Sequence, residues 1–135
     1  MKNITVVTGG AGFIGGHLVE ELLARDYEVR VVDNLVAGKR EHVPAGATFF
    51  KTDIRDSTAL APIFSGAHTV FHLAALPRVE YAIQHPIETH EVNITGTLRV
   101  LQAAREAGVR RFILASSAAI YGSHEETPLS EDLPP

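Results

Sequence analysis

Five glycines lie close together near the start of the sequence, at spacings that could bind a phosphate group. They follow the β-branched run at residues 4–8 directly and precede a helical pattern: Gly9, Gly10, Gly12, Gly15 and Gly16. Glycines in this position let the chain turn sharply and bring bare backbone against a pyrophosphate. The helix that follows presents free N–H groups and a partial positive charge to the phosphates. The spacing therefore predicts a dinucleotide-phosphate site, and the alternative is a tight turn with no ligand.

An acidic residue, Asp33, ends the next apolar run, eighteen residues after Gly15. A carboxylate in this position accepts hydrogen bonds from an adenosine ribose, and it repels a 2′-phosphate. It therefore favours NAD over NADP. The alternative is a loop-capping acid, because Asp followed by Asn is also good turn chemistry. Lys39 and Arg40 could receive a 2′-phosphate, but we interpret them as a solvated face.

Five short apolar runs alternate with helical patterns, and these elements must position the glycines and the acid. We expect strands at residues 4–8, 29–33, 48–52, 69–74 and 111–116, and helices at 11–25, 57–64 and 86–107. The runs are nearly continuous rather than alternating, which is typical of strands buried on both faces. The alternation predicts an α/β fold of the Rossmann type, a doubly wound parallel sheet with strand order 3-2-1-4-5.

The composition limits the classes of protein to which this chain can belong. The chain has 135 residues, the length of one ordinary domain, and no cysteine, which excludes disulfides and thiolate metal sites. Its net charge is −4 and its basic residues are scattered, which argues against a nucleic-acid partner. No run approaches the roughly 18 apolar residues of a membrane span, and the histidines show no metal-binding spacing. We expect a cytoplasmic protein with no metal site and no membrane partner.

Six motifs in order resemble one known family. They are TGGAGFIGGHL, VVDNL, KTDIRD, HLAA, EVNITGTLRVLQAA and ASSAAIYG, and they extend over residues 1–131. Together they resemble the extended short-chain dehydrogenase/reductase family, and within it the nucleotide-sugar epimerases and dehydratases, with UDP-glucose 4-epimerase as the type. The resemblance implies NAD as cofactor and a nucleotide sugar as substrate of a full-length parent enzyme, which transiently oxidises a sugar hydroxyl.

The resemblance also implies residues for the adenosine half of the cofactor. Asp33 and Asn34 would meet the ribose. Asp53 and Ile54 would flank the adenine, with the Asp53 side chain accepting from its amino group, although Asp53 could simply begin a helix. The pyrophosphate would be held by Gly9, Gly12, Phe13, Ile14 and Gly15.

For the other half of the cofactor, the resemblance implies a wall where the strand order reverses, formed by Leu73, Ala74 and Ala75. Asn93 would support the loop beneath the nicotinamide, and the alternative is a polar helix face. Ser117 would be the active-site serine, with Ser116 beside it in the cofactor site. Both serines fall at the carboxyl end of a strand, where ligands bind in open α/β sheets. His72 closes another strand, and we interpret it as a packed histidine.

In this family the catalytic residues are a Tyr-x-x-x-Lys pair, in which the lysine favours the ionised form of the tyrosine. None of the three tyrosines, Tyr27, Tyr81 and Tyr121, has a lysine four residues later. We therefore expect residues 1–135 to be an incomplete NAD-binding Rossmann domain, lacking the catalytic helix and the substrate domain and inactive alone. The alternatives are a non-catalytic NAD-binding regulatory module and a half-enzyme completed by another chain.

Association with other chains is expected at two surfaces. The helix at 86–107 would expose a face that family members use for homodimers. The fifth strand would lie at an edge of the sheet, and an apolar edge strand favours association through its unpaired backbone groups.

Overall fold

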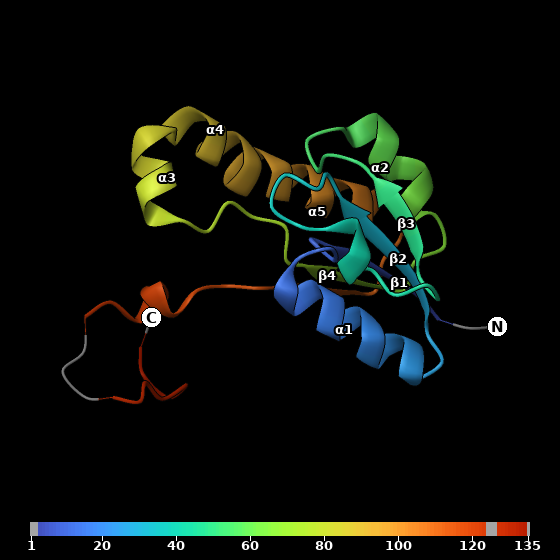
Figure 1. Ribbon diagram of the computed structural model, residues 1–135, viewed down its shortest axis with the longest axis horizontal. Helices are drawn as coiled ribbons and strands as arrows, with labels where there is room; N and C mark the ends of the chain where they lie inside the picture. The colour runs from blue at the N-terminus through green and yellow to red at the C-terminus, as the bar shows by residue number, and fades with distance from the viewer. Residues whose placement is uncertain (1–2, 124–126, 135) are drawn as a thin grey trace.

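The computed structural model describes residues 3–123 and 127–134, and they form an α/β fold around a parallel sheet (Figure 1). The strands are β1 (Ile4–Thr8), β2 (Glu28–Asp33), β3 (Thr48–Lys51), β4 (Thr69–His72) and β5 (Arg111–Leu114). Their order is β3-β2-β1-β4-β5, and every neighbouring pair is parallel. The predicted Rossmann-type sheet and its strand order are confirmed.

Helices cover both faces of this sheet. The helices of the described residues are α1 (Phe13–Ala24), α2 (Ser57–Phe64), α3 (Val79–Gln84), α4 (Pro86–His90) and α5 (Thr97–Glu106), with a π-helical segment η2 (Glu91–Gly96) and two short 3₁₀ turns, η1 (Arg40–His42) and η3 (Ala118–Tyr121). Figure 1 shows α1 on one side of the sheet and α2 and α5 on the other. Three layers result, with the sheet in the middle.

Two hydrophobic cores lie on opposite faces of the sheet because adjacent strand residues point to opposite sides. Val6 of β1 belongs to the core under α2 and α5, where Phe64 and Val100 are completely buried. Val7 belongs to the core under α1, which contributes Val19. Burying each of these valines contributes on the order of 1.5–3 kcal/mol. The continuous apolar runs are thus explained by a sheet buried on both faces.

The long helix predicted at 86–107 differs most from the structure. It consists of α4, η2 and α5, and a further helix, α3, precedes it. The two predicted ends are correct: Pro86 occupies the first turn of α4, and Gly108, at φ +71°, follows α5. A π turn holds more residues per turn than an α turn, and the apolar pattern did not reveal it.

Several boundaries also differ from prediction. The chain leaves the sheet at His72 and Leu114, two residues before the predicted ends of β4 and β5. The first helix begins at Phe13 rather than Ala11, because Gly12 is extended (φ −78°, ψ 176°) and serves as its N-cap. Apolar residues continue past the last paired residue of a strand, so the hydrophobic run overstates its length. β2 begins one residue earlier and β3 ends one residue earlier than predicted.

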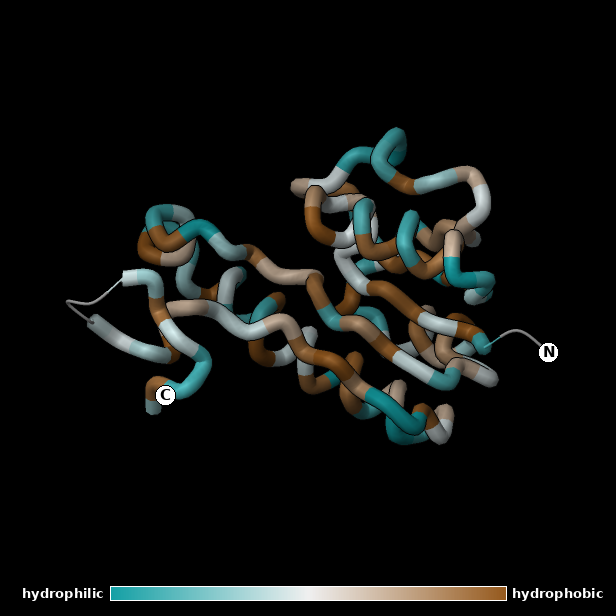
Figure 2. Tube along the Cα trace, turned by 90° about the horizontal axis from the view of Figure 1, so that it is seen from below, coloured by the Kyte–Doolittle hydropathy of each residue, from teal (hydrophilic) through white to brown (hydrophobic). Residues whose placement is uncertain are grey.

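Hydrophobic stretches of the chain are concentrated in the strands and in the helix faces that meet them (Figure 2). Beyond β5 the chain runs away from the sheet, and residues 127–134 lie at the opposite end of the molecule from the start of β1 (Figures 1 and 2). Among the described residues, no helix combines the length and the apolar character needed to cross a bilayer.

Candidate functional site

The glycine turn is built into the ends of two strands. Gly9 adopts φ +73°, in the left-handed region, and its N–H donates to the carbonyl oxygen of Val32 at 2.8 Å. A Cβ on Gly9 would lie 2.7 Å from the backbone nitrogen of Ala74. Only glycine satisfies both conditions. The turn is therefore held between the carboxyl ends of β2 and β4, where the strand order reverses.

The first turn of α1 opens toward solvent with the features of an anion site. Its N-cap is Gly12, which offers no side chain to cap the first N–H groups, and the turn contains no acidic residue. Phe13 and Ile14 are 79% and 68% exposed. The first N–H groups of a helix have no partner within the helix and carry partial positive charge. The backbone around residues 12–14 can therefore bind phosphate oxygens.

Gly15 is required by the glycine turn itself. A Cβ here would collide with the carbonyl oxygen of Gly9 and lie 2.6 Å from the Cα of Gly10. The close contact of Gly15 is therefore with the backbone of the turn that precedes the helix.

Asp33 joins the end of β2 to the glycine turn. Its Oδ2 accepts from the backbone N–H of Ala11 at 3.1 Å, and its Oδ1 accepts from Leu35 N–H at 2.8 Å. The second bond is the turn capping that we considered as the alternative for Asp33. A carboxylate has about four acceptor positions, so Asp33 retains room to accept hydrogen bonds from two ribose hydroxyls. The capping role and the binding role are therefore compatible.

Lys39 and Arg40 follow Asp33 along the chain, and both are exposed. The Lys39 N–H donates to the carbonyl oxygen of Ala11 at 3.0 Å, while its ammonium group is 3.7 Å from Glu41. The Arg40 guanidinium lies 4.8 Å from the centre of the Phe49 ring. Each side chain has a local contact, as expected for a solvated face.

Asp53, which follows β3, accepts more hydrogen bonds than Asp33 does. Its Oδ1 accepts from Arg55 N–H and Nε–H, both at 2.9 Å, and its Oδ2 accepts from Arg55 Nη2 at 2.8 Å and from Asn34 Nδ2 at 3.1 Å. The hydrogen bond from the Arg55 side chain is the main cause that lowers the pKa of Asp53 to about 2. Asp53 is thus fixed next to Asn34, and an adenine amino group would compete with Asn34 for it.

Ile54 could flank an adenine through its backbone only. Its side chain is 5% exposed and belongs to the hydrophobic core, where it lies against Gly96. A ligand beside this segment would meet the Ile54 backbone rather than its side chain. Next along the chain, Asp56 caps α2 by accepting from the N–H of Ala59 at 3.0 Å, so the helix-starting role that we weighed for Asp53 belongs to Asp56.

The loop after β4 is held by Asn93. Leu76 N–H donates to Asn93 Oδ1 at 2.8 Å, and Asn93 Nδ2 donates to the Leu76 carbonyl oxygen at 3.0 Å. The side-chain amide therefore satisfies both backbone groups of one loop residue. The same loop carries the residues predicted to form the cofactor wall, Leu73, Ala74 and Ala75, of which Ala75 is exposed and the other two are half-buried.

The two predicted serines lie farther along the sheet, beyond β5. Ser116 and Ser117 are exposed, and Ser117 Oγ accepts from the N–H of Ala119 at 3.2 Å, which caps η3. They share the carboxyl edge of the parallel sheet with the glycine turn, since all five strands run the same way. The hydrogen bonds described for Ser117 stay within its own turn.

His72 is buried, as predicted, but it is also hydrogen-bonded on both sides. Its Nδ1 lies 2.6 Å from Thr8 Oγ1, and its Nε2 lies 2.9 Å from Thr97 Oγ1. His72 is 2% exposed, and burial lowers its pKa to about 4. The sequence interpretation missed Thr8 and Thr97. Thr97 is four residues after Asn93, so the same helix face carries both, and that spacing was the available signal.

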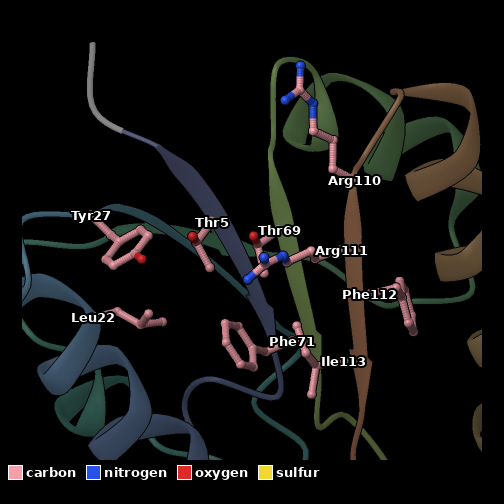
Figure 3. Close-up of a pocket in the computed structure, with 9 residues that line it drawn as sticks. All are labelled: Thr5, Leu22, Tyr27, Thr69, Phe71, Arg110, Arg111, Phe112 and Ile113. Carbon is pink, nitrogen blue, oxygen red and sulfur yellow. The ribbon is translucent and has the colours of Figure 1, made fainter.

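A separate hollow of about 580 Å³ lies on the α1 side of β1, β4 and β5 (Figure 3). Leu22 and Tyr27 line it at one end, and Phe112 and Ile113 of β5 line it at the other. Thr5 and Thr69, near the amino ends of their strands, also line it, so the hollow is away from the glycine turn. Within the described residues, no group of three or more acidic or histidine side chains could hold a metal ion.

A family model matches residues 5–135, nearly the whole chain: NAD dependent epimerase/dehydratase. Among curated relatives, a UDP-glucose 4-epimerase of Streptomyces lividans is 40% identical over 99% of this chain and 42% of its own length. A UDP-glucose 4-epimerase of Klebsiella pneumoniae is 38% identical, over 93% of this chain and 97% of its own length.

Solved structures show the same likeness. UDP-glucose 4-epimerase from Thermus thermophilus, in complex with NAD, superposes with a TM-score of 0.88 at 44% identity, over 96% of this chain and 42% of that one. The enzyme from Thermotoga maritima, solved with UDP-glucose, has a TM-score of 0.87 at 40% identity, over 91% of this chain and 41% of that one. The chain thus spans about two-fifths of the length of these two enzymes.

Proposed function

Because the chain belongs to the NAD dependent epimerase/dehydratase family, we propose that it binds NAD and forms the cofactor-binding part of a nucleotide-sugar epimerase or dehydratase. The observation that carries the proposal is the glycine turn between β2 and β4, with Asp33 bonded to it. A Cβ at Gly9 or Gly15 would collide with backbone, and these two glycines would shape a cradle for a pyrophosphate. Residues 1–135 would then constitute one NAD-binding domain.

The proposed contacts on the adenosine side follow from this geometry. The N–H groups at the start of α1, at Phe13 and Ile14, would donate to the phosphates next to the bare backbone of Gly12. Asp33 would accept from the ribose hydroxyls with its remaining acceptor positions, and Asn34 would lie beside it. Its negative charge would disfavour a 2′-phosphate, so NAD rather than NADP is the expected ligand.

Asp53 and Ile54 would border the adenine, and Asp53 would take the adenine amino group in place of Asn34. On the other side, the wall of Leu73, Ala74 and Ala75 would be held in place by Asn93.

Bound NAD supplies a hydride acceptor, which permits transient oxidation of a sugar hydroxyl and return of the hydride. Ser117, with Ser116 beside it, would hydrogen-bond the substrate hydroxyl or the carbonyl oxygen from the carboxyl edge of β5. The family's Tyr-x-x-x-Lys pair does not occur in the 135 residues. We therefore expect NAD binding without turnover from this chain alone.

Titration calorimetry with NAD and with NADP tests the proposal. The wild type should bind NAD more tightly than NADP. In Asp33→Asn, which keeps the shape of the side chain but removes its charge, affinity for NAD should fall about tenfold, the equivalent of one charge-assisted hydrogen bond. Glu21→Gln, on the exposed face of α1, is the matched control and should bind like wild type. A folded wild-type sample that gives no heat with millimolar NAD would refute the proposal.

A second candidate, a non-catalytic NAD-binding module, is favoured by the missing Tyr-x-x-x-Lys pair, and the third is a half-enzyme completed by another chain. An epimerase assay with UDP-glucose distinguishes them: activity that appears only when a second chain is added supports the half-enzyme. NAD binding that no added chain converts into turnover supports the module.

A homodimer through residues 86–107 is proposed because Leu98 and Leu101 are 63% and 41% exposed there. Light scattering of wild type and of Leu98→Arg tests it: a dimer that becomes a monomer in the variant supports this face, and an unchanged mass refutes it. The cytoplasmic location stays a prediction.

A further inference from the structure

Polar side chains form one continuous hydrogen-bonded path behind the candidate site, which we call the Thr8–Asn93 path. Thr8 Oγ1 is 2.6 Å from His72 Nδ1, and His72 Nε2 is 2.9 Å from Thr97 Oγ1. Thr97 Oγ1 is in turn 2.7 Å from the backbone carbonyl oxygen of Asn93, whose side chain holds both backbone groups of Leu76. The path leads from β1 across β4 to α5 and η2, and returns to the loop after β4.

The direction of each hydrogen bond follows from the chemistry of the groups. A carbonyl oxygen only accepts, so the Thr97 hydroxyl donates its single proton to Asn93. Thr97 Oγ1 must then accept from His72, which places the ring proton on Nε2. Nδ1 is left as an acceptor and takes the Thr8 proton. Thr8 Oγ1 can then accept from the first two amide groups of the loop after β4, each 3.3 Å away.

This arrangement requires a neutral imidazole. A second ring proton, on Nδ1, would point at Thr8 Oγ1 and force that hydroxyl to reverse its direction. Burial lowers the pKa of His72 to about 4, and its ring lies beside that of the uncharged Phe112, with a centroid distance of 6.0 Å. The ring therefore stays neutral at ordinary pH, and each polar group of the path has a partner.

We propose that His72 is a positioning residue, which as the Nε2–H tautomer joins the glycine-bearing strand β1 to Asn93 and so fixes the loop at residues 73–78. The proposal rests on the NAD-binding function proposed above, because this loop would form the wall beside the cofactor. His72 acts through Thr97 and Asn93 rather than on the cofactor itself. The π-helical segment η2 contributes by carrying Asn93, and π turns recur at functional sites.

Thr97→Val is the variant that breaks the path, because it removes one hydroxyl and keeps the shape of the side chain. Thr69→Val is a matched control. Thr69 also contacts a histidine, with its Oγ1 2.9 Å from His68 Nδ1, and it is 9% exposed. It lies at the opposite end of β4, away from the loop. The two variants therefore lose the same kind of hydrogen bond on two sides of the molecule.

Calorimetry with NAD should show affinity about tenfold weaker in Thr97→Val and changed less than twofold in Thr69→Val, as expected for loss of one buried hydrogen bond at the site only. Thr97→Ser, which restores the hydroxyl, should regain the affinity of wild type. Amide hydrogen exchange at Leu76 should accelerate in Thr97→Val alone. Equal affinities in the two valine variants, with unchanged exchange at Leu76, would overturn the proposal.

Nitrogen-15 NMR of the histidine rings gives an independent test. If the proposal is correct, the His72 ring carries its proton on Nε2 at pH 7. A ring protonated on Nδ1, or on both nitrogens, would overturn it. A folded wild-type chain that binds no NAD would refute the proposed function only. The tautomer and the exchange rate at Leu76 would still decide whether His72 positions the loop.

Discussion

Strands β1 and β5 are both short apolar segments, yet their environments are opposite. Val6 and Val7 of β1 are fully buried, whereas Ile113 and Leu114 of β5 are 40% and 53% exposed. β1 pairs with β2 and β4 and has helices on both faces, while within the described residues β5 pairs with β4 alone and faces the hollow of Figure 3. Apolar content predicts a strand, but the neighbours of that strand decide how much of it is buried.

The largest effect is expected where β1 enters the glycine turn. Gly15→Ala places a Cβ against the backbone of that turn, which cannot move without releasing β2 and β4. We expect it to cost more than about 4 kcal/mol in free energy of unfolding, or to prevent folding. In Gly108→Ala no atom lies within 4 Å of the new Cβ, and only the left-handed φ of +71° opposes it.

That control should lose only about 1–2 kcal/mol, the cost of placing one non-glycine residue in the left-handed region. Urea unfolding of both variants measures the difference. Equal losses would mean that the backbone around Gly9 adapts, contrary to the rigid turn described here.

The second prediction compares the two strands directly. Val7 and Ile113 stand in one row across the sheet, each opposite Phe71. Val7→Ala should lower the free energy of unfolding by about 2 kcal/mol, because it opens a cavity in a closed core. Ile113→Ala should cost less than about 1 kcal/mol, since solvent already reaches that side chain. Chemical denaturation checks both, and a larger loss at Ile113 would show that β5 is covered in solution.

The third prediction concerns Asp53, which follows β3 at the other edge of the sheet and forms an ion pair with Arg55. The pKa of Asp53 is lowered from 3.8 to about 2 in the folded chain, chiefly by the Arg55 side chain. The stabilisation is thus present above about pH 4 and is lost as the pH falls toward 2. It amounts to about 1 kcal/mol once the partial exposure of Arg55 is allowed for.

Arg55→Gln should remove this stabilisation at pH 7 and flatten the dependence of unfolding free energy on pH between 4 and 2. Arg25→Gln, which breaks an exposed ion pair with Glu21, should change stability by less than about 0.5 kcal/mol. Unfolding curves recorded at several pH values test this, and identical curves for wild type and Arg55→Gln would contradict it.

The smallest effect is expected at Thr5, where β1 faces the same hollow as β5. Its Oγ1 is buried and finds no hydrogen-bond partner among the described residues. Thr5→Val replaces this hydroxyl by a methyl group of similar shape and should stabilise the fold by about 0.5–1 kcal/mol. Thr69→Val, which loses a hydrogen bond to His68, should destabilise it. A clear loss of stability in Thr5→Val would show that the hydroxyl is satisfied in solution.

The sequence alone determined the fold class and the position of the glycine turn beside Asp33. Local features carry this information: the continuous apolar runs predicted a parallel sheet, and the glycine spacing placed a turn between a strand and a helix. Gly9, Gly15 and Asp33 lie together in the structure because they flank adjacent strands whose carboxyl ends meet at one edge. Pro86 and Gly108 likewise marked helix ends through their own backbone preferences.

Only the tertiary structure decided which polar groups meet across the sheet. His72 and Thr97 are 25 residues apart, and Thr8 is 64 residues from His72, so no local pattern could join them. The acceptor positions of Asp53 are occupied because Arg55 folds back on it and Asn34 reaches it from the end of β2. The exposure of β5 was decided in the same way, because burial depends on the strands and helices packed alongside, which the local sequence of a strand does not specify.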